Sequence, residues 1–254
     1  MEAFDGDTPS MLNQVTLAKQ AEALGFCALW FRDVPLRDPG FGDVGQLFDP
    51  WVYLGFMAAH THSIALGTAS IILPIRNPLH TAKAATSVDQ LSGGRLLLGV
   101  ASGDRPVEFP AFGVDPERRD SLFREYLEVF REAQRSSFMP LTWSGGTLEG
   151  ADLIPKPTTA EIPFFVTGHS RQTLEWIARY SHGWISYPRA PKTQQMTATV
   201  TTNITGVTGS RSNVAASTRL DSAKKVVVFF IKWSPVESTC QARQALGLRE
   251  STHE

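Results

Sequence analysis

The segment at residues 167–173, Thr-Gly-His-Ser-Arg-Gln-Thr, combines small, hydroxylated and basic residues in a pattern that suits phosphate binding. An apolar stretch precedes it and a helical pattern follows it, so we expect a turn between a strand and a helix. Free backbone N–H groups and the positive end of a helix dipole attract anions at such a turn. Ser170 and Thr173 add hydroxyl donors there, and Arg171 adds positive charge. The ordinary alternative is that Ser170 only caps the helix.

Charged residues follow two other apolar stretches, where they are candidates for acid–base chemistry. Asp33, with Arg32 beside it, is a candidate acid or base. An ion pair between Arg32 and Asp33 that only supports the structure is an equal alternative. A second cluster, made of Asp104, Arg105 and Glu108, has a solvated or loop-anchoring role as its alternative.

Other reactive residue types give weaker patterns. Arg76 and His80 are candidates for the mouth of a pocket, with capping or packing as the alternative for His80. The spacing of Cys and His residues indicates no metal site. The sequence also offers no Ser, His and Asp arrangement that indicates nucleophilic catalysis.

The elements that would position these residues alternate between helix and strand. Hydrophobic periodicity predicts helices at 11–24, 50–61, 81–91, 118–135 and 172–181. It predicts strands at 26–31, 64–73, 96–100, 162–167, 183–187 and 226–231, with a short hairpin inside 138–163. Asp49 and Pro50 are suited to cap and begin the second helix. Such alternation is typical of an α/β protein with a parallel sheet.

Two parallel α/β folds fit this alternation. Apolar strands with polar residues at their exits favour a TIM barrel, whose active sites lie at the carboxyl ends of the strands. A doubly wound Rossmann fold is the alternative. It is weakened because no GxGxxG motif opens a first helix.

Residues 66–103 decide between these folds by resemblance. Their sequence, LGTASIILPIRNPLHTAKAATSVDQLSGGRLLLGVASG, closely resembles the bacterial-luciferase-like family of flavin- or deazaflavin-dependent oxidoreductases. The NP, DQLSGGR and GxxxG elements occur in the family's order and spacing. The resemblance continues through 104–109 and 112–114 and returns from 165 to about 189. It implies a TIM (β/α)8 barrel.

Both ends of the chain depart from the family pattern. The family begins with a strand before residues 2–6, and most of that strand has no counterpart here. The last quarter of the chain does not match the family's closing elements. We therefore expect an incomplete barrel, with residues 1–190 as the luciferase-like domain. Residues 191–254 would be an atypical C-terminal segment of the same domain, whose order the sequence leaves open.

The resemblance implies a cofactor site at the carboxyl ends of the strands. The cofactor would be FMN or, alternatively, a deazaflavin of the 8-hydroxy-5-deazaflavin type. By alignment, the flavin ring would lie against Ala69 and Ser70, with a non-prolyl cis peptide at Ala69–Ser70 or the next bond. Ser102 would also face the cofactor. The family's phosphate-binding role falls on five residues: Gly168, His169, Ser170, Arg171 and Thr173.

Two alignments qualify the luciferase comparison. The luciferase subgroup has a phosphate-binding arginine where this chain has Ser102, so that contact is lost or passes to Arg171. A histidine implicated in proton transfer aligns with Val34, which does not support luciferase-type chemistry.

The resemblance implies a luciferase-like monooxygenase or related oxidoreductase that acts on a small organic substrate. A flavin reductase or reduced nicotinamide would supply electrons, and the family favours a homodimer. The alternative is a non-catalytic or defective flavin-binding relative. A hydrolase or aldolase on the same fold is a third possibility, without a recognisable nucleophile or Schiff-base lysine.

Composition agrees with this class of protein. The chain has 254 residues, 42% of them hydrophobic, with a formal net charge of -1. These values indicate no nucleic-acid-binding or membrane surface. The N-terminal residues lack the basic and apolar regions of a secretory signal, which favours a cytoplasmic location.

Overall fold

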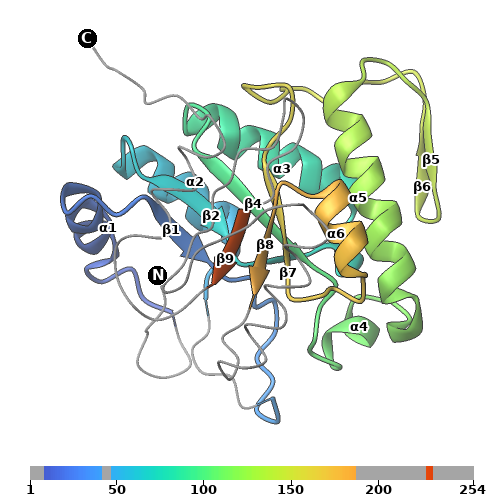
Figure 1. Ribbon diagram of the computed structural model, residues 1–254, viewed down its shortest axis with the longest axis horizontal. Helices are drawn as coiled ribbons and strands as arrows, with labels where there is room; N and C mark the ends of the chain where they lie inside the picture. The colour runs from blue at the N-terminus through green and yellow to red at the C-terminus, as the bar shows by residue number, and fades with distance from the viewer. Residues whose placement is uncertain (1–8, 42–46, 187–226, 231–254) are drawn as a thin grey trace.

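The strands of the main sheet run parallel, in the order β1-β2-β4-β7-β8-β9, with β3 also paired to β4 (Figure 1). The computed structural model describes residues 9–41, 47–186 and 227–230. Within these residues the strands are β1 (Ala28–Phe31), β2 (Ala65–Thr68), β3 (Ile71–Ile72), β4 (Leu96–Ala101), β7 (Phe164–Thr167), β8 (Gly183–Ser186) and β9 (Val227–Phe230). The predicted strand at 226–231 is therefore confirmed, as β9.

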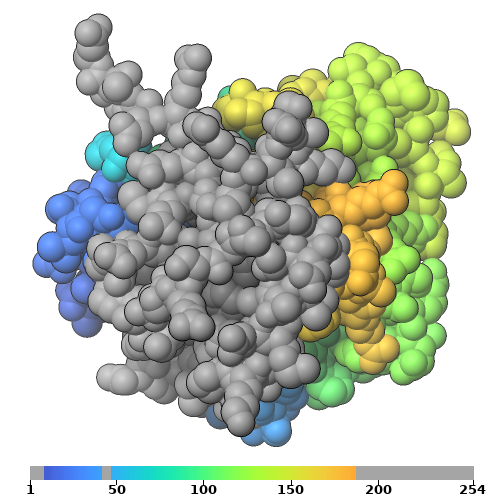
Figure 2. Space-filling view, in the orientation of Figure 1, coloured from blue at the N-terminus to red at the C-terminus, as the bar shows by residue number. Residues whose placement is uncertain are grey.

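Helices connect the strands and lie on the flanks of the sheet (Figure 1). They are α1 (Gln14–Ala23), α2 (Pro50–His60), α3 (Pro78–Leu91), α4 (Glu108–Ala111), α5 (Arg119–Arg135) and α6 (Leu174–Tyr180), with short 3-10 turns η1 (Leu73–Ile75) and η2 (Pro116–Arg118). The predicted hairpin is β5 (Leu141–Trp143) and β6 (Gly146–Leu148). Figure 2 shows the surface of α1 on one flank and of α5 and α6 on the other.

Successive strand residues pack alternately on two sides of the sheet. On β4, Leu96 and Leu98 belong to the large core shared with the helices. Leu97, between them, packs in a smaller cluster with residues from three other strands, namely Ala65, Phe165 and Ile185. A sheet with helices outside and side chains packed inside is the arrangement of a barrel wall. The α/β class and the TIM-barrel fold are therefore confirmed, and the described residues form part of the barrel wall.

Arg95 explains why the SGGR turn comes immediately before β4. Arg95 is 5% exposed, and its guanidinium holds together the ends of several elements. Nη1 donates to Thr61 Oγ1 at 2.9 Å and to the Ile64 carbonyl at 2.8 Å, while Nη2 donates to the carbonyls of Ala58 at 3.1 Å and Thr61 at 3.0 Å. Nε donates to the Ser92 carbonyl at 2.7 Å. Arg95 thus satisfies the last carbonyls of α2 and fixes the start of β2.

Several predicted boundaries differ from the structure. The strand predicted at 64–73 is divided, because the Ala69–Ser70 peptide is cis and η1 begins at Leu73. The helix predicted from 81 begins at Pro78, because the Asn77 side chain caps it by accepting from Leu79 N and His80 N. The helix predicted at 11–24 begins only at Gln14, after a left-handed Asn13. Asp49 caps α2 as predicted.

Two features expected at the chain ends lie outside the described residues. The largely missing first strand falls in 1–8, and most of the atypical segment 191–254 falls in 187–226 and 231–254. No helix in the described part of the chain has both the length and the apolar character to cross a membrane.

Candidate functional site

The candidate residues from three separate parts of the sequence follow the carboxyl ends of neighbouring strands. Asp33 comes two residues after β1, Ser102 directly follows β4, and Gly168 directly follows β7. The cis Ala69–Ser70 peptide directly follows β2. Because these strands are parallel and adjacent, their carboxyl ends share one edge of the sheet, which is where barrel enzymes place their active sites.

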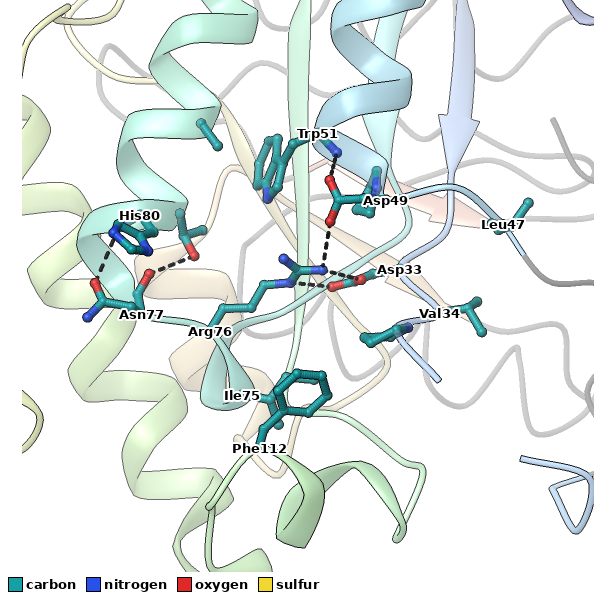
Figure 3. Close-up of a pocket in the computed structure, with 14 residues that line it drawn as sticks. Asp33, Val34, Leu47, Asp49, Trp51, Ile75, Arg76, Asn77, His80 and Phe112 are labelled. Atoms are coloured by element: carbon teal, nitrogen blue, oxygen red, sulfur yellow. Dashed lines mark hydrogen bonds and ion pairs between the residues drawn. The ribbon is translucent and has the colours of Figure 1, made fainter. Parts of the chain in front are cut away.

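A cavity of about 510 Å³ lies at this edge (Figure 3). Its lining comes from the segment after β1, the turn η1 and the amino-terminal parts of α2 and α3. Asp33, Asp49 and Arg76 form its charged corner, with Arg76 between the two carboxylates in Figure 3. Trp51 and Phe112 contribute aromatic walls.

Asp33 is held by Arg76, which lies 43 residues further along the chain. Arg76 Nη2 approaches Asp33 Oδ1 at 2.6 Å and Nε approaches Oδ2 at 2.8 Å, so the pair is bidentate. Asp33 Oδ2 also accepts from Ile72 N at 3.1 Å. Burial lowers the pKa of Arg76, but the hydrogen bonds and charge of Asp33, followed by those of Asp49, outweigh it and raise the pKa overall. Asp33 therefore makes an ion pair with Arg76, a partner that the sequence did not predict, and this pair orients the arginine.

The non-prolyl cis bond predicted near Ala69 is present, between Ala69 and Ser70. Ala69 N donates to the Phe31 carbonyl at 2.7 Å, which joins this bond to the end of β1. Beside it, Thr68 Oγ1 bridges to the Gly99 backbone, at 2.8 Å from the carbonyl and 2.9 Å from the amide nitrogen. A side chain at Gly99 would meet the Thr68 carbonyl at 1.9 Å, so glycine is required there.

The second charged cluster anchors the loop that follows β1. Glu108 is 1% exposed and its Oε1 makes no hydrogen bond to a described residue, although Arg105 Nη1 lies 3.7 Å away. Leu36 donates a backbone hydrogen bond to Glu108, and Arg105 lies over the Phe41 ring at 4.9 Å. A solvated role is therefore wrong for Glu108 and Arg105, and the loop-anchoring interpretation is correct.

Glu108 has an altered acidity in this setting. Burial raises the pKa of its carboxyl to about 7, against the opposing charge of Arg105. The negative charges of Asp33 and Asp104 raise this pKa further, while the Leu36 hydrogen bond lowers it. Burial inside the loop-anchoring cluster is thus the main cause of this raised pKa.

The predicted phosphate-binding turn adopts an unusual backbone. Gly168, Ser170 and Arg171 have positive φ angles of 58, 43 and 56 degrees. Neither Ser170 N nor Arg171 N donates to an acceptor within the described residues. Successive residues in this conformation can turn their N–H groups toward a common anion.

The side chains of this turn differ from the sequence expectation in two ways. Ser170 Oγ donates to the Thr167 carbonyl at 2.9 Å, so its hydrogen is already engaged. The helix begins at Leu174 rather than 172, and its cap is Thr173, whose Oγ1 accepts from Trp176 N at 3.2 Å. The capping role considered for Ser170 therefore belongs to Thr173, whose hydroxyl hydrogen is still available. His169 lies edge-on to Trp184, with ring centroids 5.7 Å apart.

A family model described as luciferase-like monooxygenase matches residues 3–202 of the chain. The chain belongs to this family. A relative from Mycobacterium tuberculosis, itself described as an uncharacterized protein, is 32% identical over 198 residues, covering 68% of this chain and 66% of its own length. The alkanal monooxygenase alpha chain of Photorhabdus luminescens is 25% identical over 167 residues, covering 65% of this chain and 45% of its own length. The chain thus spans about two thirds or less of these relatives.

Solved structures of luciferase-like proteins share the fold. Monooxygenase RslO1 from Streptomyces bottropensis superposes with a TM-score of 0.69 at 23% identity, covering 77% of this chain and 59% of its own. An F420-dependent secondary alcohol dehydrogenase superposes with a TM-score of 0.64 at 22% identity, covering 77% of this chain and 61% of its own. A type II Baeyer-Villiger monooxygenase from Pseudomonas putida, in complex with FMN, superposes with a TM-score of 0.64 at 16% identity. The match covers 78% of this chain and 59% of its own. At these identities the likeness concerns the fold alone.

Some site residues could not be found from sequence patterns. The role of Asp49 in the charged corner has no sequence signal beyond its place before Pro50, which indicates only a helix cap. Arg76 and His80, which were predicted at a pocket mouth, do line the cavity. Arg32, the other candidate for catalysis, is half-buried at the end of β1 and does not line it.

Proposed function

We propose that this chain is a flavin- or deazaflavin-dependent oxidoreductase of the luciferase-like monooxygenase family, acting on a small organic substrate. The cofactor would lie at the carboxyl ends of the strands, with FMN as the first candidate and a deazaflavin as the alternative. Family membership supports this proposal, and among its structural neighbours one is F420-dependent and another binds FMN. A bound flavin or deazaflavin supplies hydride transfer, and a reduced flavin can also react with oxygen.

The turn after β7 carries the proposal for the cofactor's phosphate. The positive φ angles of Gly168, Ser170 and Arg171 leave two backbone N–H groups without an acceptor in the described residues. Thr173 adds a hydroxyl hydrogen, and the exposed Arg171 and His169 add basic side chains. Donors and positive charge in one short turn fit a phosphate.

The cis Ala69–Ser70 peptide supports the position proposed for the flavin ring. Ala69 and Ser70, both small residues, directly follow β2, and Ala69 is half-buried while Ser70 is buried. Ser102, which is 5% exposed, follows the neighbouring strand β4. In this proposal Ala69, Ser70 and Ser102 form the floor beneath the ring. The Asp33–Arg76 pair then lies beside it, with Asp33 positioning Arg76.

The source of electrons and the assembly are part of the same proposal. A flavin reductase or reduced nicotinamide would supply the electrons. We propose a homodimer that uses α2, because this short apolar helix leaves Val52 70% and Phe56 42% exposed. Exposed apolar side chains on adjacent helical turns are typical of association surfaces.

Titration of the purified full-length protein with FMN and, separately, with the deazaflavin F420 tests the proposal. Absorbance and fluorescence changes should show saturable binding of one cofactor. Thr173→Val, which removes the hydroxyl that would donate to the phosphate and that also caps α6, should weaken that binding about tenfold. Glu128→Gln, on the exposed side of α5, is the matched control and should bind as the parent does. A folded protein that binds neither cofactor would refute the proposal and favour a non-catalytic relative.

A further inference from the structure

The cavity at the carboxyl ends of the strands has mostly apolar walls and a single charged corner (Figure 3). Its volume of about 510 Å³ lies within the usual range for cavities that bind small organic molecules. Its apolar lining includes Val34, Leu47, Trp51, Ile75 and Phe112. Apolar walls of this kind bind the apolar body of a ligand, and the few fixed polar groups select ligands by their polar head group.

Arg76 offers one donor that its protein partners leave unused. Nε and Nη2 are bound to Asp33, and Nη2 also lies 3.5 Å from Asp49 Oδ2. Nη1 makes no hydrogen bond within the described part of the chain. Because the bidentate pair fixes the guanidinium plane, this donor is oriented before any ligand arrives.

Asp49 offers the matching acceptor. Its Oδ1 caps α2, accepting from Trp51 N at 2.9 Å and from Val52 N at 3.2 Å. Among the described residues, its Oδ2 has only the long contact to Arg76, and the side chain is 45% exposed. A ligand oxygen near Arg76 would therefore find one donor and, if it carries a hydrogen, one acceptor.

The charges around this corner nearly cancel. Two carboxylates, Asp33 and Asp49, and one guanidinium, Arg76, line this corner, and His80 is the other titratable side chain of the lining. Helices α2 and α3 begin at the cavity wall, and each helix start contributes about half a positive charge. An anionic ligand would meet Asp49, whereas a cationic one would meet Arg76 and two helix starts. Either ion would lose hydration without a full counter-charge.

We infer that this cavity binds an uncharged organic molecule. Its apolar body would pack against Trp51 and Phe112, and its carbonyl or hydroxyl oxygen would lie at Arg76 and Asp49. This inference rests on the proposed function in taking the bound molecule to be the substrate. The binding itself requires no flavin.

Three probes with one shared body test this selectivity. Benzylacetone, hydrocinnamate and phenethylamine all carry a phenethyl group, and their heads are a ketone, a carboxylate and an ammonium. Calorimetry at about pH 8 on the full-length protein without cofactor should show benzylacetone binding at least about tenfold more tightly than either ion. Trp51→Ala should weaken benzylacetone binding about tenfold. Equal binding of the three probes, preference for an ion, or no ketone binding would overturn the inference.

Two cap substitutions change the charge of the corner in opposite directions. Asp49→Asn and Asn77→Asp both keep good helix-capping residues, so the folds of α2 and α3 should persist. Asp49→Asn should improve hydrocinnamate binding about fivefold, and Asn77→Asp should improve phenethylamine binding by a similar factor. Unchanged selectivity in both variants would contradict the electrostatic basis of the inference.

The cofactor titration separates this inference from the proposed function. Loss of FMN and deazaflavin binding with intact ketone selectivity would refute the flavin proposal and leave the cavity as a binding site. Cofactor binding without ketone selectivity would overturn only the cavity inference.

Discussion

Two glutamates at opposite ends of the sheet differ in how well the protein compensates their charge. Glu161 precedes β7, at the amino ends of the strands, where His182 Nε2 lies 2.9 Å from its Oε1. Arg131 lies 3.4 Å from Oε2, and Arg135 pairs with the same oxygen. The hydrogen bond with His182 is the largest influence on the Glu161 pKa, and although burial opposes it, the surrounding charges help to lower the value to about 2.

Glu108 follows β4, at the carboxyl ends, and its pKa is raised to about 7 by burial. Arg105 lies 3.7 Å away, and one of the Glu108 carboxylate oxygens makes no hydrogen bond to a described residue. The same residue type is thus fully paired at one end and incompletely paired at the other. This difference matches the general division in TIM barrels, whose amino ends serve stability and whose carboxyl ends carry the active site.

The largest effect should come from the amino ends, at Arg95. Arg95→Ala removes a buried guanidinium that satisfies the carbonyls of Ala58, Thr61 and Ile64. We expect the free energy of unfolding to fall by about 3–5 kcal/mol, measured by chemical denaturation. Arg118→Ala, at an exposed position before α5, is the control and should change it by less than about 0.5 kcal/mol. A small loss for Arg95→Ala would mean that the amino ends are not the rigid part of the barrel.

Glu161→Gln should lower stability in a pH-dependent way. The folded pKa of about 2 lies below the ordinary 4.5, so the charged carboxylate stabilises the protein above about pH 4.5 and this contribution is lost as the pH falls toward 2. We expect the variant to be less stable by about 1–3 kcal/mol at neutral pH, with the difference shrinking in acid. Urea denaturation across this pH range measures it. A difference independent of pH would contradict the assigned pKa.

Glu108→Gln should show the opposite pH dependence with a smaller effect. The folded pKa of about 7 lies above the ordinary 4.5, so the folded protein binds this proton more tightly and loses stability as the pH rises between these values. As the pH rises from about 5 to about 8, the free energy of unfolding of the variant should increase by about 1–2 kcal/mol relative to that of the parent. The same urea series measures this gain. If both glutamine variants shift in the same direction with pH, the contrast between the two ends is wrong.

The smallest effect should come from Ser170 in the turn after β7. Ser170→Ala removes the hydrogen bond to the Thr167 carbonyl and should cost about 0.5–1 kcal/mol of stability. FMN affinity should stay within about twofold of the parent, because the hydroxyl hydrogen is already engaged. A loss as large as that of Thr173→Val would show that Ser170 turns its hydroxyl toward the cofactor.

Local sequence signals predicted the elements better than their junctions. Asp49 before Pro50 identified the start of α2, because a cap and a first-turn proline act within a few residues. The same signal exists at Asn77 and Pro78 but was missed, so α3 was predicted three residues too short. The left-handed Ser170 and Arg171 shifted α6 to Leu174, and non-glycine residues in that conformation have no clear sequence signature.

The site itself was only partly predictable. The resemblance correctly located the Ala69–Ser70 cis bond, which residue propensities alone do not indicate. The pairing of Asp33 with Arg76 depends on two loops that meet only after the parallel strands assemble, so spacing along the chain could not reveal it. The raised pKa of Glu108 is caused by burial, which also arises only in the assembled fold. The sequence therefore could not reveal it.

Comparison of FMN with riboflavin, which lacks the phosphate, tests the central claim most directly. If the turn at 168–173 binds the phosphate, calorimetry should show FMN binding at least about tenfold more tightly than riboflavin, with the preference reduced in Thr173→Val. Equal affinity for the two compounds in the folded parent protein would contradict the claim that this turn is the cofactor's phosphate site.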